Sequence, residues 1–252
     1  MNNVKAIFCK QFKSMLKSPV MLGQAGGFLV IALLMMFFAS TFDDRDCDDC
    51  IVAYHCADCL ETNPALNAPS PSIMGLFTVF FVGMVMIGSA SALVSEDRST
   101  KNLRFMAMAN VKPTQYFVGT FVCMLMLSFG VLVIYAMAGR YFGAETFWFL
   151  LATTTGVMVS ILLGLAVGMS KKPGIAVPVS MILGMGPMLS SFNENLASIL
   201  RFTYTQQVNW VMSDLYQGVE IDFRFNFMII GINGLLAAAL FIWVNRKGKL
   251  QY

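Results

Sequence analysis

Residues 73–95 read IMGLFTVFFVGMVMIGSASALVS, and this stretch decides the fold because it contains no charged residue. A helix needs roughly 17–25 predominantly apolar residues to cross a hydrocarbon core about 30 Å thick. Inside lipid the backbone must satisfy its own hydrogen bonds, which a helix does within a single segment. Comparable apolar stretches recur along the chain. They predict six transmembrane helices, at 20–42, 73–95, 115–138, 147–169, 174–189 and 226–244.

The composition agrees with an all-α integral membrane protein. Apolar residues make up 57% of the chain and charged residues only 12%, whereas about a quarter of an ordinary soluble domain is charged. There is too little polar surface to cover a water-soluble globule. Residues 1–252 are therefore expected to form a single transmembrane domain.

The distribution of basic residues predicts the orientation, since Lys and Arg accumulate in loops that stay in the cytoplasm. With the N-terminus inside, 13 of the 17 basic residues lie on the inner side and 12 of the 14 acidic residues on the outer side. The inner basic residues are Lys5, Lys10, Lys13, Lys17, Arg98, Lys101, Arg104, Lys112, Lys171, Lys172, Arg246, Lys247 and Lys249. Both ends are thus expected in the cytoplasm (N-in/C-in). The net charge of +3 reflects this sidedness and does not indicate nucleic-acid binding.

The first 19 residues have apolar side chains at helical spacing, with lysines mostly between them. This pattern predicts an amphipathic interfacial helix at 1–19, on the inner membrane surface and in contact with lipid. The alternative is the basic start of a cleaved signal peptide. The apolar run that follows is about twice the usual length for one.

The predicted outer loop at 43–72 contains two Cys-x-x-Cys pairs, Cys47 with Cys50 and Cys56 with Cys59. Only residues 51–55 separate the pairs, whereas paired motifs that bind zinc are typically about 12–20 residues apart. Cysteines on the oxidising side of a membrane tend to form disulfides. Structural disulfides, a metal site and free or redox-active thiols all remain open.

The predicted outer segment at 190–225 has its own helical periodicity. Ser191-x-x-Glu194 has the spacing of a capping box, and apolar residues after it return to one face. Tyr204 and Trp210 suit the headgroup layer. A helix embedded in the outer interface is therefore expected, with an ordinary solvated loop as the alternative.

The spans lack two kinds of chemistry. No Asp, Glu, Lys, Arg or His lies in the middle of a span, although ion-coupled carriers and channels place such residues at membrane depth. The chain also lacks a G-x-x-x-x-G-K-[ST] phosphate-binding loop, which an ATP-hydrolysing subunit needs. A secondary transporter or channel is therefore the weaker alternative, and any ATP-driven motor must be a separate chain.

Small residues and prolines in the spans suggest how the helices pack. Gly23-x-x-x-Gly27, Gly88-x-x-x-Ala92 and Gly164-x-x-x-Gly168 can each bring two helix backbones close together, most simply within the chain. Pro178 and Pro187 predict a kinked or broken fifth span.

The cytoplasmic loop at 96–114 is the most informative segment. Its mixed charges could merely enforce topology. However, Leu103, Met106 and Ala107 recur at helical spacing and form an apolar face that no span uses. Such a face can dock into a groove on a partner protein.

This loop resembles the permease subunits of type-2 ABC exporters, in which an acidic and basic stretch follows span two and leads into a short helix and a turn. Glu96, Asp97, Arg98 and Leu103 match this pattern, as does the turn Val111-Lys112-Pro113-Thr114. A glycine usual in the family is Ser99 here, and a basic residue often seen early in span three is Thr120. The interfacial start, six spans and outer helical segment extend the resemblance over nearly the whole chain.

The resemblance implies a transport subunit without catalytic residues or cofactors of its own, located in the bacterial plasma membrane. ATP and Mg²⁺ would be bound by a partner ATPase chain, and two permeases would pair as a homodimer or heterodimer. The substrate would be a drug, peptide or lipid-like molecule moved outward. Residues expected to couple to the ATPase are Glu96, Asp97, Arg98, Lys101, Leu103, Arg104 and Met106. A membrane thiol or metal protein built on the four loop cysteines is the alternative from another class.

Overall fold

The computed structural model describes residues 12–13, 27, 30–31, 34, 73–102, 113–138, 141, 143–170, 173–190, 194–217 and 222–248. No strand occurs among these residues. The predicted surface helix, the first span and the cysteine-containing loop lie largely or wholly outside them. Those three features therefore stay predictions.

Four of the six predicted spans coincide with helices that are long and apolar enough to cross a membrane. The second span is continuous and has three parts, α4 (Ile73–Phe80), a π-helical turn η2 (Phe81–Val85) and α5 (Met86–Ser99). The third, fourth and sixth spans are α7 (Pro113–Ala138), α8 (Ala144–Gly168) and α12 (Phe223–Gly248). The chain is thus an α-helical integral membrane protein, while the count of six and the orientation stay predictions.

The fifth predicted span is a shorter apolar helix, α9 (Ala176–Ser190), preceded by the 3₁₀ turn η3 (Pro173–Ile175). α9 is not broken at either proline. Pro178 lies in its first turn, where a missing N–H leaves no helical bond unmade, and Pro187 lies in its last turn.

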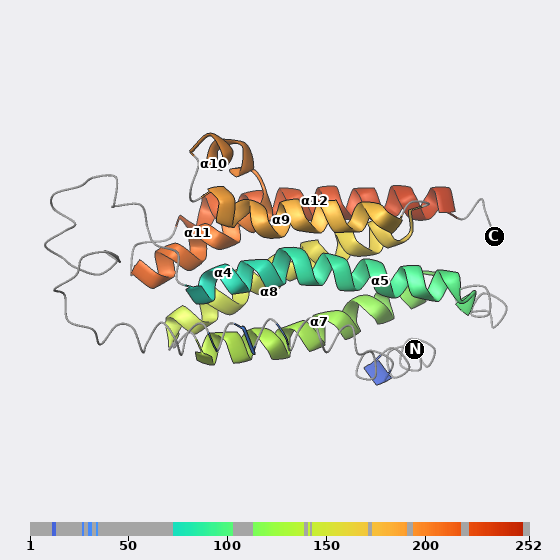
Figure 1. The fold of residues 1–252 in the computed structure, drawn as a ribbon, viewed down its shortest axis with the longest axis horizontal. Coiled ribbons are helices and arrows are strands. Elements are labelled where there is room, and N and C mark those ends of the chain that lie inside the picture. The colour runs from blue at the N-terminus through green and yellow to red at the C-terminus, as the bar shows by residue number, and fades with distance from the viewer. Residues whose placement is uncertain are drawn as a thin grey trace, which may run out of the picture.

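The helices form an elongated bundle in which α8 packs against α5, α7, α11 and α12 (Figure 1). α4, η2 and α5 also contact α9. α5 and α12 end at the same end of the bundle, and α10 (Glu194–Leu200) and α11 (Tyr204–Gln217) lie toward the other (Figure 1).

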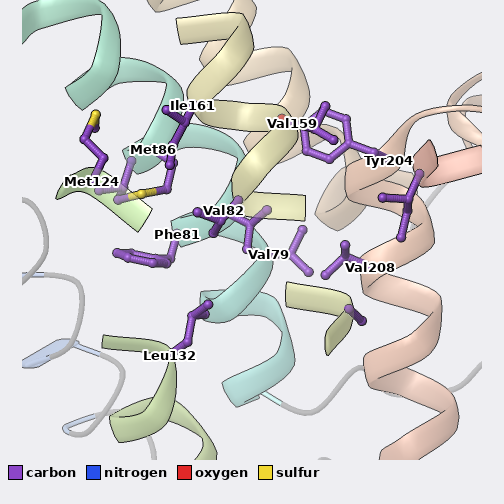
Figure 2. Packing of buried hydrophobic residues seen from close by; sticks show 14 of the residues in the cluster. Val79, Phe81, Val82, Met86, Met124, Leu132, Val159, Ile161, Tyr204 and Val208 are labelled. Atoms are coloured by element: carbon purple, nitrogen blue, oxygen red, sulfur yellow. The ribbon is translucent and has the colours of Figure 1, made fainter. Parts of the chain in front are cut away.

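Side chains from η2, α4, α8 and α11 meet in the apolar core (Figure 2). Val79 and Val82 point toward Val208 of α11, while Phe81 points toward α7. The ring of Phe81 lies 5.8 Å from that of Tyr135, measured between centroids. The core therefore joins the second span to helices on both of its sides.

Glycines bring two pairs of helices into backbone contact. A Cβ added to Gly164 would lie 2.6 Å from the carbonyl oxygen of Ile87, and one added to Gly168 would lie 2.7 Å from that of Ser91. The predicted use of Gly164-x-x-x-Gly168 in packing within the chain is confirmed. Gly88, in contrast, faces open space. A similar contact joins Gly83 of η2 to α9, since a Cβ there would lie 2.8 Å from the Cα of Gly184.

Large apolar side chains are exposed along the outward faces of three helices, as expected for surfaces that face lipid. On these helices the exposed side chains include Met126 and Met137 of α7, Val177 and Ile182 of α9, and Leu235 and Leu236 of α12.

The predicted outer segment at 190–225 is helical, and its place in the membrane interface stays a prediction. It contains two helices, α10 and α11, and α11 packs against α4, α8, α9 and α12. Gln206 and Asn209, expected away from the apolar face, are buried. The physical reason is that polar groups of other helices meet α11, so its polar side also faces protein.

Candidate functional site

α5 ends in a compact turn that starts the loop between the second and third spans. The backbone N–H of Thr100 donates to the carbonyl oxygen of Glu96 over 2.9 Å, and that of Lys101 donates to the carbonyl of Arg98 over 3.1 Å. The hydroxyls of Ser99 and Thr100 also donate to the carbonyl of Glu96, both over 2.9 Å. Lys101 has a φ of 59°, the left-handed conformation that commonly terminates a helix.

Asp97 ties this turn to the start of α7. Its side chain is only 8% exposed. The hydroxyl of Tyr116 donates to one carboxylate oxygen over 2.6 Å, and the amide of Asn102 donates to the other over 3.1 Å. A carboxylate removed from water is stable when both oxygens receive hydrogen bonds in this way. Asp97 therefore fixes the two ends of the loop relative to each other.

Arg98 ties the same turn to the end of α8. Its guanidinium donates to the carbonyl oxygens of Met169 and Ser170 over 3.2 and 3.0 Å. The last carbonyls of a helix have no partner inside it and carry partial negative charge, so a cation there is favourable. α5, α7 and α8 are thus joined at one point by the neighbouring residues Asp97 and Arg98.

Aromatic rings extend this junction to α12. The ring of Phe117 meets that of Phe241 edge to face, with centroids 5.0 Å apart and an interplanar angle of 80°. Tyr116 packs on Phe117 in a similar way at 5.1 Å. We call Asp97, Arg98, Asn102 and Tyr116 the Asp97 cluster.

The predicted coupling residues fall into three groups. Glu96 and Lys101 are exposed. Asp97 is buried and Arg98 is exposed; both make the contacts within the chain described above, and their coupling to a partner stays a prediction. Leu103, Arg104 and Met106 lie outside the described residues, as do Cys47, Cys50, Cys56 and Cys59, so their roles stay predictions. No group of three potential metal-ligating side chains occurs in the part of the chain that the structure describes.

Sequence reasoning missed Tyr116, Asn102 and the carbonyls of Met169 and Ser170. A tyrosine at the start of a span is commonly explained by the headgroup layer, so the sequence does not indicate that Tyr116 donates to Asp97. Every residue has a backbone carbonyl, so the sequence contains no signal that identifies the two acceptors of Arg98.

A second polar cluster lies around α11, at the other end of the bundle. The hydroxyls of Tyr204 and Ser160 are 2.7 Å apart, and Ser190 of α9 donates to Gln206 over 2.9 Å. The amide of Gln207 donates to the carbonyl of Arg201. Burial raises the pKa of Asp214 in the same helix. We call Thr205, Gln206, Gln207 and Asn209 the α11 cluster.

Three oxygens of the α11 cluster have no hydrogen-bond partner in the structure. They are Oγ1 of Thr205, Oε1 of Gln207 and Oδ1 of Asn209. Thr205 and Asn209 are one helical turn apart and therefore share a face of α11.

The fold and these contacts define a helical membrane protein whose loop after the second span is anchored at three helix ends. The family model for the ABC-2 type transporter matches residues 2–213, and the chain belongs to that family. It is accordingly a permease subunit of an ABC transporter, the transmembrane component and not the ATPase. Comparison with curated proteins and with solved structures gives no match.

Proposed function

We propose that this chain is the permease of an ABC exporter, which moves a drug, peptide or lipid-like substrate outward across the bacterial plasma membrane. A separate ATPase chain binds ATP and Mg²⁺ and drives the cycle. Two permeases, identical or different, pair to form the path. The segment 96–112 is the element that docks on the ATPase.

The observation that carries this proposal is the anchoring of the loop. A docking element transmits force only if it is held firmly by the helices that it moves. Asp97 and Arg98 hold the start of the loop against the start of α7 and the end of α8 through three hydrogen bonds. The loop residues that follow carry the apolar side chains Leu103 and Met106, which are suited to a groove on the partner.

The test replaces Leu103 and Met106 together with Asp. Truncating a buried anchor of an interface typically costs about 2 kcal/mol or more, and a buried unpaired charge costs more still. We expect the variant to insert normally and to lose the ATPase that copurifies with the tagged wild-type chain.

The matched control replaces the exposed charges Glu96 and Lys101 with Gln in the same loop. Rim charges contribute little individually, so this variant should retain the ATPase. Wild-type amounts of ATPase on the Leu103 and Met106 double variant would show that the loop is not the docking element.

A further inference from the structure

The contact between Arg98 and α8 joins residues that are 71 and 72 positions apart in the chain. It reaches from the first residues of the loop to the last turn of a different span. Met169 is the C-cap of α8, and the connection to α9 begins directly after it. Arg98 therefore contacts the point at which α8 ends and the chain turns toward α9.

The rest of α5 is also packed tightly on α8, because the two helices touch through their backbones. Gly164 and Gly168 leave no room between α8 and the Ile87–Ser91 turn of α5. Close-packed interiors transmit displacement and do not absorb it. η3, which leads into α9, contacts both α5 and α8.

The neighbouring residues Asp97 and Arg98 connect the loop to two different helices. Tyr116 of α7 and Asn102 of the loop hold the carboxylate of Asp97, while the adjacent Arg98 donates to the carbonyl oxygens at the end of α8. A displacement of the loop must then displace α7 and α8 together.

We infer that Arg98 is a positioning residue that makes the last turn of α8 and the connection to α9 follow the docking loop. The inference rests on the proposed function. It adds α8 to the helices that the loop would move, besides the two spans that the loop joins. It also changes the role expected for Arg98, from a charge that faces the ATPase to a cap on α8.

The two roles predict different results when Arg98 is replaced. A charge at the rim of the docking surface would affect binding of the ATPase and its salt dependence. A cap on α8 would leave binding intact and remove the response of α8 to nucleotide.

The experiment is hydrogen exchange on the permease purified with its copurifying ATPase, with and without Mg-ATP and vanadate. The reporter is the peptide covering residues 165–176. In the wild-type complex, trapping with vanadate should change the exchange rate of this peptide. In Arg98→Ala the change should shrink about two- to thirtyfold, the range over which single substitutions alter coupling between distant sites, while the ATPase stays bound.

Two further variants keep the test decisive. Arg98→Lys retains the positive charge near the helix end but replaces the two-pronged guanidinium with a point charge, so it should fold and show an intermediate response. Glu145→Gln, an exposed position in the first turn of α8 at the far end of the same helix, should respond like the wild type.

An unchanged nucleotide response in both Arg98 variants would overturn the inference. Loss of the ATPase from Arg98→Lys would overturn it as well, since it would place Arg98 in the docking surface. Failure of any ATPase to copurify with the wild-type chain would instead defeat the proposed function itself.

Discussion

The Asp97 cluster buries Asp97 and Tyr116, and the α11 cluster buries all four of its polar side chains, yet the two clusters differ in how these groups are satisfied. In the Asp97 cluster, Tyr116 and Asn102 donate to the carboxylate of Asp97, and Arg98 donates to carbonyl oxygens at the end of α8. In the α11 cluster, three oxygens have no partner in the structure. Thr120, one turn deeper in α7 than Tyr116, also has an unpartnered hydroxyl, so the contrast is between two clusters and not between two halves of the bundle.

A buried oxygen without a donor destabilises a protein by about 1–3 kcal/mol. The unpartnered oxygens around α11 therefore reduce the stability of the fold, whereas the carboxylate oxygens of Asp97 both receive hydrogen bonds. A cluster with satisfied partners holds helices in fixed relation. One with unsatisfied acceptors gains free energy from any rearrangement or ligand that brings donors to them.

The largest expected effect concerns the helix contacts beside each cluster. Gly164→Ala would place a methyl group 2.6 Å from the backbone of α5, which cannot yield without moving the helix. Gly156→Ala would approach the methyl groups of Val208 and Val82 at 3.0 Å and no backbone atom, so a shift of a few tenths of an ångström accommodates it. Overpacking costs about 1–3 kcal/mol, and we expect Gly164→Ala at the upper end.

Gly156→Ala should be nearly neutral, because alanine recovers up to about 1 kcal/mol of helix propensity. The measurement is the temperature at which half of the detergent-solubilised protein disappears from its gel-filtration peak. Equal losses for the two variants would mean that the α11 side is as tightly packed as the α5–α8 contact.

The second prediction compares two tyrosines of α7. Tyr116 is 2% exposed and donates to the Asp97 carboxylate, while Tyr135 is fully buried and its hydroxyl has no partner in the structure. Tyr116→Phe should cost about 1.5–3 kcal/mol, the usual worth of a hydrogen bond to a charged group. Tyr135→Phe should leave the same melting temperature unchanged or raise it.

Asp97→Asn combined with Tyr116→Phe gives the control, since the second substitution should matter less once the carboxylate is gone. Additive losses would show that the two side chains are not coupled.

The spans could be predicted because membrane insertion depends on length and hydropathy, which a sequence contains directly. The close contact at Gly164-x-x-x-Gly168 could also be predicted. The same spacing occurs at Gly88-x-x-x-Ala92, but Gly88 faces open space. The spacing of two small residues shows that another helix can pack closely against them, but it does not show which helix does so.

The candidate site could be predicted less well. Asp97 and Arg98 were recognised as important, but a charge pattern cannot tell a surface contact from a contact with Tyr116 or with carbonyls of a distant helix. α11 was recognised as a helix, but the packing of its polar side against other helices was not. Gln206 is polar whether it meets a headgroup or Ser190 of α9, so amphipathic periodicity cannot separate these environments.

The smallest effect that we predict has the opposite sign and concerns Thr205. This threonine is fully buried and its hydroxyl has no partner in the structure, so Thr205→Val removes an unpaired polar group while keeping the shape of the side chain. Thr153 of α8 is equally buried, but its hydroxyl donates to the carbonyl of Phe149 over 2.7 Å. Removing the unpaired hydroxyl should stabilise the protein by about 1 kcal/mol, which corresponds to a rise of about 2–4 °C in the melting temperature for a chain of this size. Thr153→Val should give no rise, because it discards a hydrogen bond that is already made. If Thr205→Val lowered the melting temperature as much as Thr153→Val, the hydroxyl of Thr205 would have a donor or acceptor in the membrane-embedded protein, and the contrast between the two clusters would be lost at that position.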